Sequence, residues 1–171
     1  AGDVLLNPFP MVNMAGIGGM LLPWLISGSR LVQHHPFDLP TFLRQVAEER
    51  VTYTVAPPAL LTMLLGMEEM LAKADLSSLR IIGSGSAPLS PAMVKGWQER
   101  YGINVTNFFG SNEGVALLGD PASIPDPEAR ARFFPRKPAV AGLQTKLIDL
   151  DTGDEITEAG RAGELCVAGP T

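Results

Sequence analysis

Cysteine, histidine and charge are all scarce in this chain of 171 residues, which has one cysteine and two histidines. The single Cys166 excludes an internal disulfide framework and a cysteine-based zinc site. It fits a reducing compartment, so we expect a cytoplasmic protein. Charged residues make up 18% of the chain, below the roughly 25% of an average soluble domain. This deficit indicates that part of the surface is normally covered.

Basic residues are in the minority, with 13 Lys and Arg against 18 Asp and Glu. A surface that binds nucleic acid is normally basic, so we expect no nucleic-acid partner. A long hydrophobic run is also missing: no charge occurs from Val4 to Ser29, but only Met14 to Ile26 is continuously apolar. A spanning helix needs about 20 residues, so we predict a buried helix there and no transmembrane segment.

Segments with helical and strand-like patterns alternate along the first two thirds of the chain. The spacing of apolar residues and the positions of proline and glycine predict helices over 14–27, 38–50, 59–65 and 90–101, and strands over 30–33, 51–56, 79–82 and 103–109. Repeated helix and strand units are typical of a parallel sheet. We therefore predict an α/β fold, a largely parallel sheet with helices on both faces.

The pattern changes after residue 118. Residues 119–138 are rich in Pro, Asp and Arg and are interpreted as a connecting excursion, whereas 139–171 resemble the start of a β-rich subdomain with a small antiparallel segment. Asp149 and Asp151 flank turn residues and are assigned to hairpin-turn chemistry. We thus divide the chain into an α/β subdomain over 1–118, the excursion, and a truncated β-rich part.

Two polar loops are expected at the carboxyl ends of neighbouring strands, where open α/β sheets collect ligands. The first, Gly83 to Pro88, lacks the Rossmann, Walker and hydrolase-elbow patterns, so taken alone it predicts only a tight strand-to-helix turn. The second follows Asn107 and two phenylalanines and contains Glu113. The Asn107 amide can match the edge of adenine, a phenylalanine ring can stack on the base, and the Glu113 carboxylate can bind Mg²⁺. The alternative is that the phenylalanines pack in the core and Glu113 is solvated in a turn.

Three other groups of residues have both a functional and an ordinary interpretation. The adjacent His34 and His35 would point to opposite sides of a strand, so loop residues are favoured over a metal site. A basic cluster could meet a phosphate or a partner, but a solvated loop is preferred; it comprises Arg130, Arg132, Arg136 and Lys137. Three methionines could line an adaptable pocket, with core packing preferred; they are Met11, Met14 and Met20.

In combination, five ordered segments resemble the adenylate-forming (AMP-binding) superfamily, which includes acyl-CoA synthetases such as the fatty-acid–CoA ligases. They cover nearly the whole chain and comprise Pro10 to Gly16, Phe37 to Pro58, Leu76 to Ser90, Asn107 to Glu113 (similar to "YGxTE"), and Gly163 to Pro170 (similar to "GELxxxGP"). Each segment alone is weak evidence, but five in the same order are specific.

This resemblance implies that a carboxylic acid, fatty or aromatic, reacts with ATP to give an acyl-adenylate and then passes to coenzyme A, with Mg²⁺ required. The implied catalytic residues are Asn112 and Glu113, and Glu113 is the implied metal ligand. The implied nucleotide-binding residues are Gly85, Ser86, Ala87, Pro88, Asn107, Phe108, Phe109, Gly110, Ser111 and Asn112. The implied acyl-pocket residues are Asn13, Met14, Gly83 and Gly114.

Three positions depart from the superfamily pattern. Phe109 replaces the usual tyrosine, Asn112 the usual threonine, and Asn13 a common histidine. The last two changes motivate an alternative, a noncatalytic nucleotide-binding or scaffolding module that retains the fold. Among protein partners, we also consider a second copy of the chain, which would form a homodimer.

The resemblance also implies parts that these residues lack. A phosphate loop with its lysine should precede them, and a ribose-binding aspartate, a hinge and a mobile C-terminal domain with a catalytic lysine should follow. We therefore expect a central piece of the N-terminal domain of a larger enzyme, and we expect this piece alone to be inactive.

Overall fold

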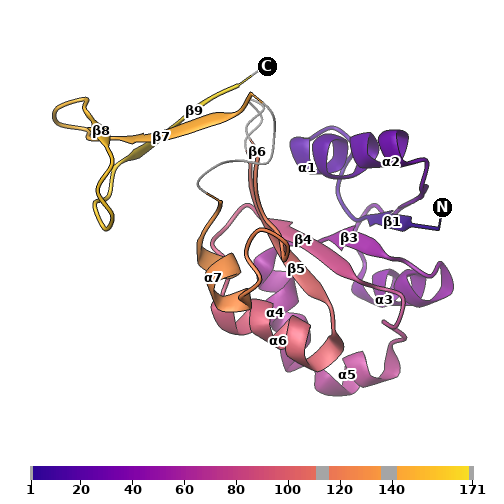
Figure 1. The fold of residues 1–171 in the computed structure, drawn as a ribbon. Helices are drawn as coiled ribbons and strands as arrows, with labels where there is room; N and C mark the ends of the chain where they lie inside the picture. The colour runs from indigo at the N-terminus through magenta and orange to yellow at the C-terminus, as the bar shows by residue number, and fades with distance from the viewer. Residues whose placement is uncertain (1, 111–115, 136–141, 170–171) are drawn as a thin grey trace.

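The computed structural model describes residues 2–110, 116–135 and 142–169. Its main sheet has six strands in the order β2-β1-β3-β4-β5-β6 (Figure 1). These strands are β1 (Val4–Asn7), β2 (Arg30–Gln33), β3 (Tyr53–Val55), β4 (Ile81–Gly85), β5 (Asn104–Gly110) and β6 (Ala116–Gly119). All neighbouring pairs are parallel except β5 and β6, which are antiparallel. The largely parallel sheet is confirmed.

Helices cover both faces of this sheet, as predicted. One face carries a continuous helix made of α1 (Met14–Gly16), a π-helical turn η1 (Ile17–Leu21) and α2 (Leu22–Ser27) (Figure 1). The other face carries α3 (Leu39–Glu48), α4 (Pro58–Gly66), α5 (Glu68–Lys73) and α6 (Pro91–Tyr101). Because side chains alternate along a strand, Leu5 packs with Met20 on the first face and Leu6 joins the larger core on the second.

Local signals place the helix ends where the sequence predicts them. Asp38 caps α3 by accepting a hydrogen bond from the backbone N–H of Thr41 at 2.9 Å. Gly28 and Gly102 end α2 and α6 in the left-handed conformation, with φ of 65° and 68°. These ends fix the direction in which the chain enters each following strand.

The cap at Asp38 predicts a pH-dependent contribution to stability. Hydrogen bonds from Thr41 hold the pKa of the Asp38 carboxyl below its ordinary value of 3.8. The stabilisation is therefore present above that ordinary value and is lost as the pH falls through the lowered one. In urea unfolding at neutral pH, we expect Asp38→Ala to unfold at lower urea than the wild type. Asp38→Asn should keep most of the cap but lose its acid dependence; an unchanged midpoint for Asp38→Ala would contradict the assignment.

The excursion after residue 118 contains structure that the sequence analysis did not predict. Strand β6 starts before it, and helix α7 (Pro127–Arg132) packs against α6 and β5. Asp126 caps α7, Pro127 occupies its first turn and Glu128 follows. This combination is a helix-start signal that the interpretation as an excursion overlooked.

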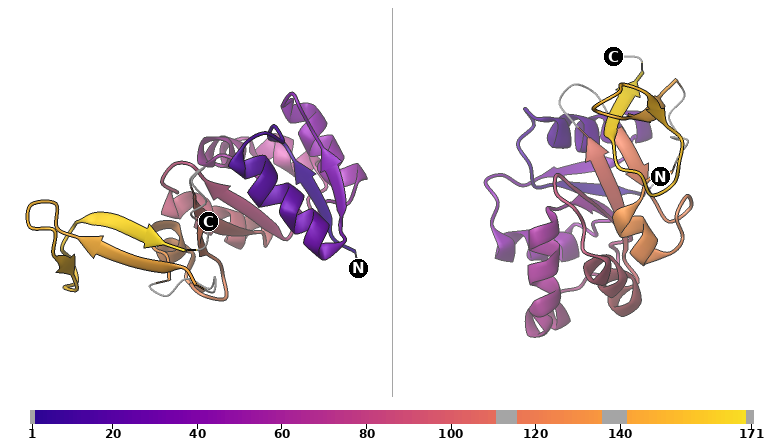
Figure 2. Two further views of the ribbon diagram at one scale, coloured as in Figure 1. Left: turned by 90° about the horizontal axis from the view of Figure 1, so that it is seen from above. Right: turned by 90° about the vertical axis from the view of Figure 1, so that its left-hand side faces the viewer.

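The remaining strands form a separate three-stranded antiparallel sheet, in the order β8-β7-β9. Its strands are β7 (Gln144–Ile148), β8 (Glu155–Ile156) and β9 (Glu164–Ala168), and Figure 2 shows this ribbon projecting from the main sheet. Asp149 accepts hydrogen bonds from the backbone of Asp151 and Thr152, which hold its pKa below the ordinary value. The assignment of this aspartate to hairpin-turn chemistry is confirmed.

Across the described ranges of the chain, no helix has both the length and the apolar character that crossing a membrane requires.

Candidate nucleotide and acyl site

The two predicted loops leave neighbouring parallel strands. In the pairing of β4 with β5, Ser84 lies opposite Asn107 and Gly85 opposite Phe108. Gly85, from which the first loop leaves, therefore lies beside the end of β5 at the carboxyl edge of the sheet, where α/β proteins bind ligands. This adjacency is the geometric condition for one ligand to touch both.

The first loop begins later than predicted. Strand β4 continues through Gly83, Ser84 and Gly85, although glycine and serine are weak strand formers. All three residues pair with β5 and Gly83 pairs also with β3, while the hydroxyl of buried Ser84 donates to the carbonyl of Ala56 at 2.8 Å. Only from Ser86, whose φ is 67°, does the chain turn toward α6.

Two glycines in β4 allow an unusually close approach of Phe108. A Cβ at Gly83 would lie 2.3 Å from Cε2 of the Phe108 ring, and a Cβ at Gly85 would lie 2.2 Å from the Phe108 carbonyl oxygen. The ring therefore lies over Gly83, on the side of the sheet that α1 and α2 cover. Gly83 was predicted to line the acyl pocket, and here it contributes the flat surface on which this ring lies.

Asn107 points to the opposite face, toward α7. It is 6% exposed, and its side-chain N–H groups donate to the carbonyls of Arg130 at 3.1 Å and Ala131 at 3.2 Å. Phe109, two residues on, is 44% exposed. Its ring meets the edge of Phe134 with centroids 6.2 Å apart. The predicted adenine-edge residue and the predicted stacking ring thus both lie beside the segment around α7.

The predicted acyl side begins at Asn13, which caps α1 by accepting a hydrogen bond from the backbone N–H of Gly16 at 2.8 Å. Met14 starts the helix and is partly buried. The π-helical turn that follows carries Gly19, whose carbonyl accepts a hydrogen bond from the Tyr53 hydroxyl at 3.4 Å. Burial raises the pKa of that hydroxyl, so it remains a proton donor. The helix that covers the proposed acyl pocket is thereby fixed to β3.

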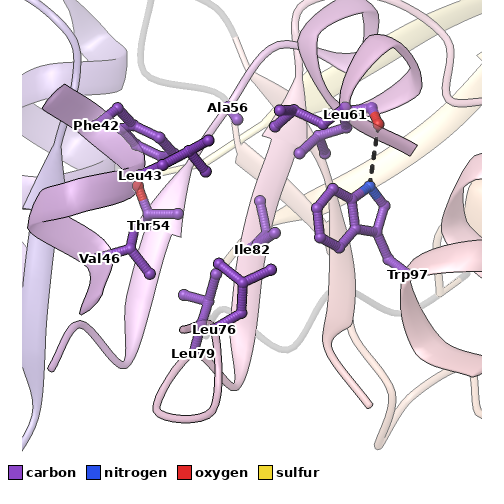
Figure 3. Close-up of a pocket in the computed structure, with 11 residues that line it drawn as sticks. Phe42, Leu43, Val46, Thr54, Ala56, Leu61, Leu76, Leu79, Ile82 and Trp97 are labelled. Atoms are coloured by element: carbon purple, nitrogen blue, oxygen red, sulfur yellow. Dashed lines mark hydrogen bonds between the residues drawn. The ribbon is translucent and has the colours of Figure 1, made fainter. Parts of the chain in front are cut away.

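An apolar cavity of about 10 Å³ lies on the other side of the sheet (Figure 3). Phe42, Leu61, Ile82 and Trp97 are among its lining residues, and the indole N–H of Trp97 donates to the Leu61 carbonyl at 3.2 Å. A space of this size is at the lower limit for a single water. It is a gap in core packing between the sheet and helices α3, α4 and α6, and it is too small for a substrate.

The interpretation of Arg130 as part of a solvated loop was wrong. Its side chain is fully buried, at 0% exposure, because α7 folds it against β5 and α6. Met20 is also fully buried and belongs to the core, as preferred. His34 lies in the loop after β2, as predicted, and its Nε2 accepts a hydrogen bond from the backbone of Asp38 at 2.9 Å.

Several predicted site residues lie outside the described residues: Ser111, Asn112, Glu113 and Gly114, together with Arg136 and Lys137 of the basic cluster. Within the described parts, no group of three or more His, Cys, Asp or Glu side chains could hold a metal ion. The assignment of Glu113 to magnesium therefore stays a prediction.

Comparison with known proteins agrees with the resemblance. The family model described as "AMP-binding enzyme" matches residues 1–171. A "4-coumarate–CoA ligase-like 3" of Arabidopsis thaliana is 29% identical, over 99% of this chain and 30% of its own length. An indoleacetate–CoA ligase of Aromatoleum aromaticum is 28% identical, over 99% of this chain and 32% of its own length.

Solved structures share the fold. The anthranilate CoA ligase AuaEII, determined with anthranoyl-AMP, superposes with a TM-score of 0.81 at 24% identity, covering 98% of this chain and 31% of that one. The chain thus spans about a third of the length of the proteins it matches. With the family model matched from end to end and CoA ligases among its relatives, this chain belongs to the AMP-binding, adenylate-forming enzyme family.

Proposed function

We propose that the polypeptide containing this chain is an AMP-forming acid–thiol ligase. It joins a carboxylic acid to ATP, releases pyrophosphate, and passes the acyl group of the adenylate to the thiol of coenzyme A. The observation that supports this most directly is the pairing of Gly85 with Phe108, because it brings the two loops implied in nucleotide binding to one edge of the sheet.

Three features of the described residues suit a nucleotide. Ser86 to Pro88 follow the end of β4, and Phe109 at the end of β5 has an exposed ring that could stack on a base. Asn107 supplies an amide at the same edge. Magnesium would neutralise charge on the phosphate oxygens, and Glu113 is the residue proposed to hold it.

The proposed acid is apolar, either fatty or aromatic. Helix α1–η1–α2, which would cover it, has no charged residue, whereas an amino-acid substrate would require a carboxylate to pair with its ammonium. The aromatic residues Phe9, Trp24, Tyr53 and Phe108 pack on this side of the sheet. Relatives named for coumarate and indoleacetate make aromatic acids the first class to test.

The test is pyrophosphate release by the whole polypeptide with ATP, Mg²⁺, coenzyme A and a panel of aromatic and fatty acids. If Glu113 binds the metal, Glu113→Gln should lower kcat by roughly 10²- to 10³-fold, the usual effect of removing one group that stabilises transition-state charge. Glu69→Gln, an exposed change on α5, serves as the control and should leave kcat unchanged. Release that does not depend on Glu113, or no release with any acid, would favour the noncatalytic module.

A further inference from the structure

Arg130 is a fully buried cation, and its hydrogen-bond partners among the described residues are all uncharged oxygens. Its Nε donates to the carbonyl of Val105 on β5 at 2.9 Å. One terminal nitrogen donates to the carbonyls of Ile124 and Pro125 at 2.9 and 3.1 Å, and the other to the side-chain oxygen of Gln98 on α6. A planar guanidinium can make all of these contacts at once, which the single ammonium of lysine cannot do. One side chain therefore joins α7, its preceding loop, α6 and β5.

The backbone of Arg130 also accepts a hydrogen bond from β5. The backbone carbonyl of Arg130 accepts a hydrogen bond from the side-chain amide of Asn107, two residues beyond Val105, and the carbonyl of Ala131 accepts the second. An asparagine amide has two hydrogens, and here both are used by the end of α7. The position of α7, set by the Arg130 side chain, thus fixes which way the Asn107 amide points.

With both hydrogens bound, the group that Asn107 has left to offer a ligand is its carbonyl oxygen, a pure acceptor. An acceptor attracts the 6-amino group of adenine and repels the 6-oxo group of hypoxanthine or guanine. We propose that Arg130, acting through Asn107, is a positioning residue that makes the nucleotide site select 6-aminopurines over 6-oxopurines. This inference rests on the proposed function and adds a determinant of its base selectivity.

The experiment compares ATP with ITP, whose base is 6-oxo, as substrates of the whole polypeptide. We expect the wild type to prefer ATP by roughly tenfold or more in kcat/KM, the usual consequence of facing a buried acceptor with another acceptor. Arg130→Lys keeps the charge but not the planar fork, and should reduce this preference about tenfold. The matched control is Arg132→Lys, an exposed arginine on the same helix, which should leave the preference intact.

Each result has a distinct meaning. If Arg130 only supports the fold, Arg130→Lys lowers the rates with ATP and ITP equally, and the preference stays as in the wild type; this would overturn the inference. A wild type that uses both nucleotides equally would also overturn it, while leaving the ligase function intact. A wild type that uses neither would refute the function itself. If Arg130→Lys does not fold, Gln98→Ala, which removes one partner of the same guanidinium, replaces it and must lower the preference.

Discussion

Replacing Gly85 by alanine is expected to remove nucleotide binding and to destabilise the sheet. The new Cβ would lie 2.2 Å from the carbonyl oxygen of Phe108, a backbone atom that cannot rotate away. Strands β4 and β5 would have to separate at the edge where the two loops meet. Overpacking usually costs 1–3 kcal/mol, and because backbone must move here we expect about 3 kcal/mol or more, measured by urea unfolding alongside ATP binding.

Two other glycine replacements serve as comparisons. Gly66→Ala, at the exposed end of α4, has no atom within 4 Å of the new Cβ and should be neutral or slightly stabilising. Gly83→Ala meets the Phe108 ring, which can tilt, so its cost should be smaller than that of Gly85→Ala. A Gly85→Ala protein as stable as the wild type would show that β4 and β5 are not in this register.

Truncation of Trp97 to alanine is expected to give the largest loss of stability that a side-chain deletion produces in this fold, about 3–5 kcal/mol. The indole, on α6, is 2% exposed and packs against α4 and the sheet. It already borders the small apolar cavity, so its removal would enlarge an existing gap. Its N–H would also leave the Leu61 carbonyl without this donor.

Other substitutions separate the volume of this side chain from its hydrogen bond. Trp97→Phe keeps most of the packing and loses the bond to Leu61, so it should cost about 1–3 kcal/mol. Trp24→Ala, on α2, removes a tryptophan that is only partly buried and should cost less than Trp97→Ala. Equal urea midpoints for the two alanine variants would contradict the burial described for Trp97.

The sequence predicts the parallel sheet well because each of its main signals acts locally. Asp38, Gly28 and Gly102 determine helix ends through bonds and backbone angles within a few residues. The adjacency of the two loops also follows, since consecutive strands joined by a helix are usually neighbours. These features require no knowledge of distant contacts.

The features that the sequence did not predict depend on contacts between distant segments. Gly83 and Gly85 look like the start of a loop, but pairing of both with β5, and of Gly83 with β3, holds them in a strand. Arg130 looks solvated because a buried arginine is rare. It is buried here because carbonyls of β5 and the loop before α7, together with Gln98, satisfy its donors. Neither arrangement can be found from spacing within one segment.

The strand order also constrains how the chain assembles during synthesis. Strand β1 lies between β2 and β3, and the hydroxyl of Thr54 donates to the carbonyl of Leu6, 48 residues earlier. The ends of such a large loop must meet before any pairing energy is gained, which slows folding. The antiparallel contact of β5 with β6 joins residues at most 12 apart and can form early. The apolar strand β1 is therefore translated well before β3, the later of its two neighbours. Until β3 has been made, β1 remains vulnerable to aggregation.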